Sequence, residues 1–342
     1  MKTFRSGLKQ PGLALLLVMF IVALSSMLVV NLTYSTYLGS RISVTAERSV
    51  QAEYLLKSAL NYAMVLLKED IEPGDSGKDI WGKYANGLPI QRTDLLPYTL
   101  PDVPMELEIR PEGAKLDIRQ LVPSNLTGLP DVNIRGILER LFANDLVKVG
   151  FEFDGEEFAA PDGQTFKFTS KDLISNLIDY MDRDETAYAD SGYQGVEGPN
   201  SLFPNREITR IGELAAVPGF TASRVKKLLP YLTTVDNRQI NINLAPKVML
   251  MSLTPELDAT VADAIIAFRK SDLGPFKNAN ELQSVLNSES IYEKIRGLVA
   301  YESGRFQIVA KVEYSTSIFF LRADVAKTSR KQLPDIKTME LF

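Results

Sequence analysis

Residues 13–30 read LALLLVMFIVALSSMLVV, a run of 18 residues without a charge. As an α-helix, a run of this length crosses most of the apolar core of a bilayer. Three basic residues precede it, at Lys2, Arg5 and Lys9, and no acidic residue occurs before Glu47. Positive charge on the short flank predicts a cytoplasmic N-terminus, with the bulk of the chain on the other side of the membrane.

The helical pattern continues beyond the apolar run. No proline occurs from Ser40 to Asp70, and apolar residues recur there at spacings of three and four, at Leu55, Ala59, Tyr62, Ala63 and Leu66. This spacing predicts an amphipathic helix with one face to bury. Glu72-Pro73-Gly74 predicts its end. A helix from Leu13 to about Asp70 has a length of roughly 85 Å at ~1.5 Å per residue.

The sequence pattern of the rest of the chain predicts strands first, then helices, then strands again. Residues 103–109 alternate as a strand, and 114–121 are expected to return as its hairpin partner. Residues 306–314 and 318–325 predict a second hairpin, and 330–334 a disordered tail or a short docking segment. The stretch between the hairpins is mainly helical by its periodicity, with helices predicted at 134–147, 171–181, 207–214, 223–232, 246–253, 258–270 and 279–286. This order predicts an α+β fold with a large inserted all-α domain.

Composition excludes many catalytic sites. The chain has 342 residues and contains neither Cys nor His. Disulfides, thiolate nucleophiles, imidazole-based triads and HExxH zinc sites are therefore impossible. No Walker or GxGxxG loop occurs, and the net charge of −5 argues against a general nucleic-acid binder. We expect a protein that is not an enzyme.

Gly12 separates the basic leader from the apolar helix. A leader, a glycine and an apolar helix together resemble the prepilin-peptidase site of type IV pilins and type II secretion pseudopilins, cut between Gly12 and Leu13. Most of those proteins have Glu as the fifth mature residue, whereas this chain has Leu17. The chain resembles the general secretion pathway protein K family, minor pseudopilins that lack this Glu. A subunit at the filament tip has no earlier amine to neutralise, and an unpaired carboxylate in lipid is unfavourable.

The resemblance implies a domain layout for the whole chain. Residues 1–12 are expected to be the leader peptide, 13–30 the transmembrane part of the long helix, and 31–122 the periplasmic helix and first strands of a type IV pilin-like domain. Residues 123–305 are expected to form the inserted helical domain, which is SAM-like or helix–hairpin–helix-like. Residues 306–342 are expected to hold the closing strands and the tail.

The resemblance also implies a function and partners. Protein K starts assembly of the type II secretion pseudopilus with the I- and J-type minor pseudopilins, for export of folded proteins. Prepilin peptidase, which also methylates the new N-terminal amine, and the inner-membrane assembly platform are further expected partners. The secretin and the exported substrate are candidate contacts. The expected location is the inner membrane, with one span and most of the chain in the periplasm.

One acidic segment is a candidate cation site. Asp179, Asp182 and Asp184 lie at a predicted helix end, and a glycine-rich loop follows as far as Glu197. Clustered hard oxygen ligands suit Ca²⁺, but the spacing is not that of an EF-hand. The protein K resemblance also implies calcium in the inserted domain, and it gives these four residues as the candidate ligands. A solvated acidic loop is the alternative.

Two segments resemble helix–hairpin–helix modules: Ile211–Phe220 resembles the first helix and hairpin of such a module, and Ile240–Leu286 resembles a competence-type DNA receptor. In such modules, hairpin glycines let backbone N–H groups approach a phosphate. The first hairpin keeps Gly219 but has Thr221 at the second glycine position, and the second hairpin, residues 254–258, has no glycine and two carboxylates. We therefore expect protein contacts here and no nucleic-acid binding. A membrane-tethered DNA-binding receptor and a minor pilin of a type IV pilus remain alternative functions.

Overall fold

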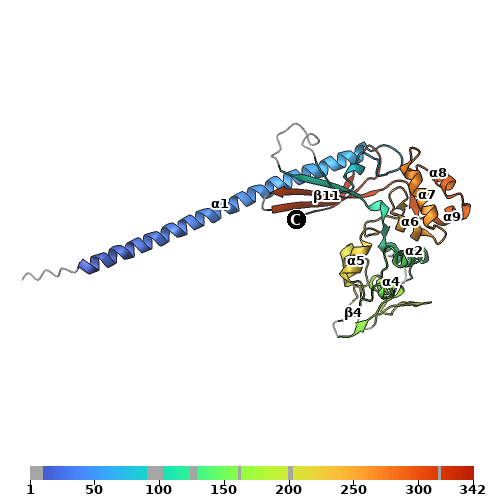
Figure 1. The fold of residues 1–342 in the computed structure, drawn as a ribbon, viewed down its shortest axis with the longest axis horizontal. Coiled ribbons are helices and arrows are strands. Elements are labelled where there is room, and N and C mark those ends of the chain that lie inside the picture. Colours follow the sequence, from blue (N-terminus) through green and yellow to red (C-terminus); the bar gives the residue numbers. More distant parts are fainter. Residues whose placement is uncertain (1–10, 91–102, 124–128, 161–162, 199–202, 315–316) are drawn as a thin grey trace, which may run out of the picture. The chain divides into compact units, whose positions relative to one another are not determined.

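The structure, a computed structural model, describes residues 11–90, 103–123, 129–160, 163–198, 203–314 and 317–342 (Figure 1). The chain forms two compact units, one ending at Lys57 and one running from Ser58 to Phe342. Helix α1 (Pro11–Glu69) starts in the first unit and ends in the second. The long helix predicted from the sequence is therefore confirmed.

The first unit consists of the N-terminal part of α1. Proline suits the first helical position because its missing N–H has no partner there in any helix. The apolar part of α1 is long and hydrophobic enough to cross a membrane, and none of its most apolar window is buried within the protein. Leu13 and Leu17 are both exposed on this helix. The structure therefore contains a continuous helix of the length that the predicted membrane span requires.

The second unit contains an antiparallel sheet of five strands, in the order β1-β2-β11-β12-β13. The strands are β1 (Leu88–Pro89), β2 (Met105–Pro111), β11 (Arg305–Tyr314), β12 (Ser317–Ala326) and β13 (Asp335–Leu341). In the register, Ala310 lies opposite Leu107 on one side and Leu321 on the other. All three side chains are fully buried. The alternation that predicted strands 306–314 and 318–325 thus defines the core face, and their hairpin is confirmed.

The predicted partner of the first strand was wrong. Strand β2 pairs with β1 and with β11, whereas residues 114–121 do not join this sheet. They form the 3-10 turns η3 (Glu112–Ala114) and η4 (Ile118–Leu121), with strand β3 (Leu116–Asp117) between them. β3 pairs in parallel with β8 (Leu232–Thr233), far along the chain. The apolar side chains of this segment pack with the helices instead of the sheet.

The C-terminal end forms an edge strand that the sequence did not predict. Residues 330–334 were expected to be a disordered tail or a docking segment, but they lead into β13, which pairs with β12 through Leu321↔Leu341. Almost every β13 side chain is exposed. An edge strand without a buried face carries no apolar alternation, which is why its sequence gave no strand signal.

Between β3 and β11 the chain is mostly helical. The helices are α2 (Val132–Ala143), α3 (Phe151–Asp154), α4 (Ser170–Met181), α5 (Ala222–Leu228), α6 (Lys247–Leu253), α7 (Ala259–Lys270), α8 (Ala279–Leu286) and α9 (Glu289–Ile295). The helix predicted at 207–214 is instead a 3-10 helix, η5 (Ile211–Ala216). Side chains cap most N-termini: the Asp258 carboxylate, for example, accepts hydrogen bonds from the first N–H groups of α7.

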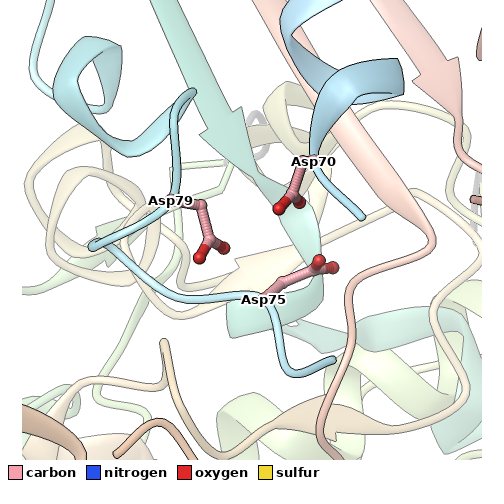
Figure 2. A group of neighbouring side chains, drawn as sticks. All are labelled: Asp70, Asp75 and Asp79. Carbon is pink, nitrogen blue, oxygen red and sulfur yellow. The ribbon is translucent and has the colours of Figure 1, made fainter. Parts of the chain in front are cut away.

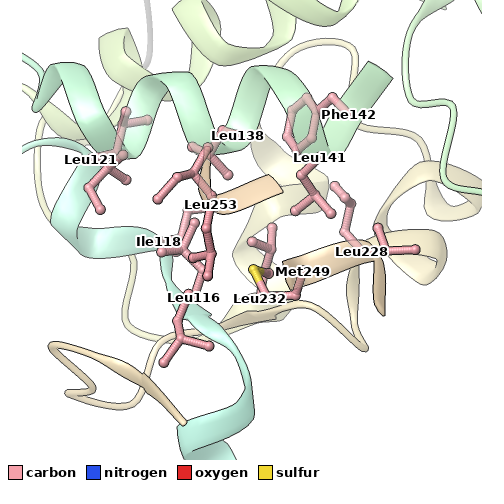
Figure 3. Close-up of a cluster of buried hydrophobic side chains, with 14 of the residues drawn as sticks. Leu116, Ile118, Leu121, Leu138, Leu141, Phe142, Leu228, Leu232, Met249 and Leu253 are labelled. Atoms are coloured by element: carbon pink, nitrogen blue, oxygen red, sulfur yellow. The ribbon is translucent and has the colours of Figure 1, made fainter. Parts of the chain in front are cut away.

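These helices, except α3, share one hydrophobic core (Figure 3). Leu116, Ile118 and Leu121 from the chain before α2 meet Leu138 and Leu141 of α2. α6 contributes Met249 and Leu253 to the same cluster. The long helix, antiparallel sheet and helical insertion together confirm the predicted α+β fold class.

Candidate functional site

The acidic segment lies at the C-terminal end of α4, in the loop that follows it. Thr169 and Asp172 form a capping box at the N-terminus of α4, and Asp182 is its C-cap. The chain then forms a small hairpin of β6 (Ala189–Asp190) and β7 (Tyr193–Gln194) and returns toward the helix end at Glu197. The hairpin therefore brings Glu197 back to the residues that it follows by 13 to 18 positions.

Three of the four predicted ligands come together. Asp182, Asp184 and Glu197 each offer a carboxylate oxygen within 4.8 Å of the others. Asp182 and Glu197 are buried, whereas Asp184 is exposed. Burial, reinforced by the charges of Asp184 and Glu197, raises the pKa of Asp182 to about 7. Its Oδ1 atom is buried and has no hydrogen-bond partner among the described residues. This oxygen is available to a cation.

Asp179 lies outside this group of three and has another role. Its Oδ1 accepts a hydrogen bond from the Tyr188 N–H (2.7 Å), and its Oδ2 accepts from Val196 (2.9 Å) and Glu197 (3.1 Å). The fully buried carboxylate thus holds both ends of the hairpin against α4. Both of its oxygens accept backbone hydrogen bonds, so Asp179 positions the loop.

A glycine makes this arrangement possible. A Cβ added at Gly195 would lie 2.0 Å from Asp179 Oδ2, so any side chain would push the loop away from the carboxylate. The sequence indicated a glycine-containing loop at this place, but not which glycine had to approach a charged group. Only the path of the loop makes Gly195 a functional residue.

Helix α2 supports the outer side of the hairpin. The Tyr193 hydroxyl donates to Glu139 (2.7 Å), and Arg135 pairs with Asp190 (2.5 Å). The Arg135 guanidinium also stacks on the Tyr193 ring, 4.6 Å from its centroid. These contacts fix the loop against α2, so the three carboxylates are held in place by the fold.

This donor set suits a hard cation. Three carboxylates supply only oxygen atoms, and Ca²⁺ takes six to eight of them, including backbone carbonyls and water. A buried group of negative charges with an unpaired oxygen is unfavourable until a cation or a proton neutralises it. The residues present therefore fit the calcium ion expected from the sequence.

In the first helix–hairpin–helix-like segment, the hairpin glycine is buried in the core. Gly219 is buried with φ +87°, and a Cβ there would lie 2.5 Å from the Phe168 ring and 2.6 Å from Leu173. A phosphate cannot approach a backbone that is covered by core side chains. The glycine that suggested a phosphate contact serves close packing instead.

The second hairpin, between α6 and α7, is closed by acidic groups. Glu256 accepts hydrogen bonds from Thr254 and Lys294, and Asp258 caps α7. Residues 206–300 carry 12 basic and 10 acidic side chains, which gives no strong positive field. Neither hairpin therefore offers the exposed glycine backbone with which such modules approach a phosphate.

The predicted processing site lies at the start of α1. Gly12 and Leu13 are in the first turn of this helix, and the leader before Pro11 lies outside the described residues. Nothing in the structure tests cleavage there, which stays a prediction.

Comparison with known proteins gives consistent results. Residues 162–237 match the family described as type II secretion system protein K, and residues 235–300 match the helix–hairpin–helix motif. A protein of Escherichia coli (strain K12) that carries the name of type II secretion system protein K is 21% identical over 240 residues. That alignment covers 69% of this chain and 66% of the relative.

The fold is also that of a solved chain. The crystal structure of the GspK–GspI–GspJ complex from the type 2 secretion system of enterotoxigenic E. coli contains a chain that matches with a TM-score of 0.62 and 14% identity. The match covers 88% of this chain and 99% of that one. Residues 162–237 thus match the protein K family, and the likeness to the solved chain shows a shared fold over most of this chain.

Proposed function

We propose that this chain is a minor pseudopilin at the tip of the type II secretion pseudopilus, where it starts assembly and has no enzymatic task. The observation that carries the proposal is one continuous helix, α1, that begins as a membrane-length apolar segment and ends in a unit holding a sheet and a protein K-type insertion. The first part suits a filament core or a membrane. The helical insertion is too bulky to repeat along a filament shaft, which favours the tip.

In this proposal the partners are the I- and J-type minor pseudopilins and the assembly platform of the inner membrane. Prepilin peptidase cuts after Gly12 and methylates Leu13. Leu17 replaces the usual Glu, because the tip subunit has no preceding amine to neutralise. The basic residues before Gly12 keep the N-terminus in the cytoplasm, and most of the chain lies in the periplasm. The secretin and the exported protein are further contacts of the insertion.

Two measurements test the assignment. Mass spectrometry of the chain from cell membranes should give a methylated N-terminus at Leu13, whereas an intact Met1 or a cut after residue 30 would contradict it. The full chain in detergent should co-purify with the I- and J-type subunits in a fixed ratio. Deletion of the gene for this chain should abolish protein secretion, and the intact gene should restore it.

We further propose that Asp182, Asp184 and Glu197 bind Ca²⁺ in the insertion. The supporting observations are the 4.8 Å grouping and the unpartnered Asp182 Oδ1. Calorimetric titration of the full chain in detergent should show heat of binding, and Ca²⁺ should raise the unfolding temperature. Glu197→Gln should remove both effects, and the exposed Asp145→Asn should keep both. No binding heat and no thermal shift in the unaltered chain would refute the site.

The two alternative functions are not favoured. If the chain were a DNA receptor, it would shift the electrophoretic mobility of labelled DNA. That shift would weaken steeply with added salt and in the variants Lys226→Ala and Lys227→Ala. The buried Gly219 and the acidic second hairpin predict no such shift. A minor pilin of a type IV pilus does not account for the protein K match in the insertion.

A further inference from the structure

A second group of three carboxylates lies just after α1. Asp70, Asp75 and Asp79 also offer oxygens within 4.8 Å of one another, and they lie at the end of α1 and on the loop that follows it (Figure 2). Asp70 and Asp75 are almost fully buried, at 4% and 2% exposure. Unlike the first group, this one contains its own cation: Lys327 Nζ lies 2.7 Å from Asp70 and 3.3 Å from Asp75.

This group, which we call the junction cluster (Asp70, Asp75, Asp79 and Lys327), connects the sheet with the helical insertion. Lys327 directly follows β12, and the Trp81 indole, which donates to Asp70 (3.1 Å), packs edge-to-face on Phe306 of β11. Asp75 accepts a hydrogen bond from the Ser303 N–H.

The insertion meets the same loop from the other side. Asn241 Nδ2, from strand β9 (Ile240–Asn241), donates to the Asp75 carbonyl (3.2 Å). Gly74 has φ +89°, and a Cβ there would lie 2.6 Å from the Phe276 carbonyl oxygen. Lys78 Nζ reaches the Ser271 carbonyl (2.5 Å). The loop that carries the carboxylates is thus the connection through which the sheet holds the insertion.

The charges of the junction cluster do not balance. Three carboxylates face one ammonium, and the neighbouring polar groups from Trp81, Ser303 and Asn241 are neutral donors. The nearby Glu302 is paired with Arg330, and Lys78 points to backbone carbonyls. Full ionisation therefore leaves an excess of negative charge in a buried place, which is costly.

We propose that the junction cluster takes up a proton at mildly acidic pH and that this proton tightens the connection between sheet and insertion. Three carboxylates with a single ammonium can share a proton, which replaces repulsion by an additional hydrogen bond. Lys327 Nζ already contacts Asp70 and Asp75, so the neutralising species in this proposal is a proton and not a second cation.

The titration behaviour of the group agrees with the geometry. Burial raises the pKa of Asp75 to about 6, with Asp70 adding repulsion and Lys327 opposing it. Burial also raises the pKa of Asp79 to about 6, and Asp70 and Asp75 add to the effect. Because the folded chain binds these protons more tightly than the unfolded chain, stability rises as the pH falls through about 6. This direction is opposite to that of an acid-labile ion pair.

The only tryptophan of the chain, Trp81, is a built-in probe of the cluster. The experiment uses the full chain in detergent with Asp182→Asn, which removes the other titrating carboxylate and the proposed calcium site. Trp81 emission should change between pH 7.5 and 5 with a midpoint near 6, and the unfolding temperature should rise by a few degrees over that range. Asp79→Asn should raise the unfolding temperature at pH 7.5 and move the emission midpoint to lower pH.

Asp145→Asn is the matched control, since this aspartate is 94% exposed, and it should leave both readouts unchanged. An emission that stays constant from pH 7.5 to 5 would overturn the proposal. So would an Asp79→Asn variant that loses the same stability at both pH values, because Asp79 would then stabilise the fold as an ionised group. A Ca²⁺- or Mg²⁺-dependent rise in unfolding temperature that Asp79→Asn abolishes would show a cation in place of the proton, and would also overturn it.

Discussion

The two acidic groups of this protein both consist of three carboxylates, and a buried lysine contacts one of them. Each brings three carboxylate oxygens within 4.8 Å of one another. In the junction cluster, Lys327 reaches into the group from the end of β12. The charges that act on Asp182 in the other group come from acidic side chains, those of Asp184, Glu197 and Asp179. The group in the insertion is held instead by backbone N–H groups that converge on Asp179.

This difference separates a structural cluster from the proposed calcium site. A cluster of carboxylates that contains an ammonium needs at most a proton to neutralise its remaining charge. A cluster that contains no ammonium attracts an external cation. The number of acidic residues does not distinguish the two. What decides is whether the fold delivers a basic side chain to the same place.

Removing the internal cation should have the largest effect. Lys327→Met leaves buried carboxylates without their partner, and we expect a loss of about 3–5 kcal/mol in the free energy of unfolding at pH 7.5. The loss should shrink toward pH 5, because protonation then removes the unpaired charge. Denaturant unfolding followed by Trp81 emission measures it. Lys327→Arg, which keeps the charge, should lose less, and Lys148→Met at an exposed pair should cost about 1 kcal/mol at most. Equal losses in all three variants would contradict the comparison.

Displacing the loop of the calcium group should have the next largest effect. Gly195→Ala places a Cβ against Asp179 Oδ2, so we expect a loss of about 1–3 kcal/mol in stability together with the loss of the Ca²⁺-dependent thermal shift. Gly198→Ala is the control, because a Cβ there has open space. Thermal unfolding with and without Ca²⁺ separates the two variants. A Gly195→Ala chain that still responds to Ca²⁺ would show that Asp179 does not position Glu197.

Changing the buried ligand should separate binding from stability. Asp182→Asn should weaken Ca²⁺ binding at least tenfold, about 1.4 kcal/mol. Without Ca²⁺ the same variant should be more stable than the unaltered chain at pH 7.5. Burial raises the pKa of Asp182 to about 7, so its charged form opposes folding at that pH. Calorimetric titration and thermal unfolding in a calcium chelator give the two numbers. A variant that is less stable in the chelator would contradict this interpretation.

The exposed ligand should matter least. Asp184 is solvated, so Asp184→Asn should weaken Ca²⁺ binding by only a few fold, less than about 1 kcal/mol. The same titration as for Asp182→Asn measures it. If Asp184→Asn weakened binding more than Asp182→Asn, the buried oxygen would not be the principal ligand.

Much of the fold could be predicted because it depends on local patterns. The spacing of apolar residues gave α1, α4, α6, α7 and α8 within a few residues, and alternation gave β11 and β12. The failures occurred where the local pattern is ambiguous or absent. Residues 114–121 alternate like a strand, but their apolar side chains pack on α2 and α6. Strand β13 has no buried face, and helix α9 is a short segment of seven residues.

The sequence by itself determined the membrane-length helix, the absence of cysteine and histidine chemistry, and the acidic character of the loop after α4. These properties depend on composition and on neighbours within a few positions. Only the tertiary structure decided which carboxylates meet and what they meet. Asp70 and Lys327 are 257 residues apart in the chain, and Asp179 organises a loop up to 18 residues away. Contacts between distant residues depend on the path of the whole backbone, and that path made one acidic group a structural junction and left the other open to a cation.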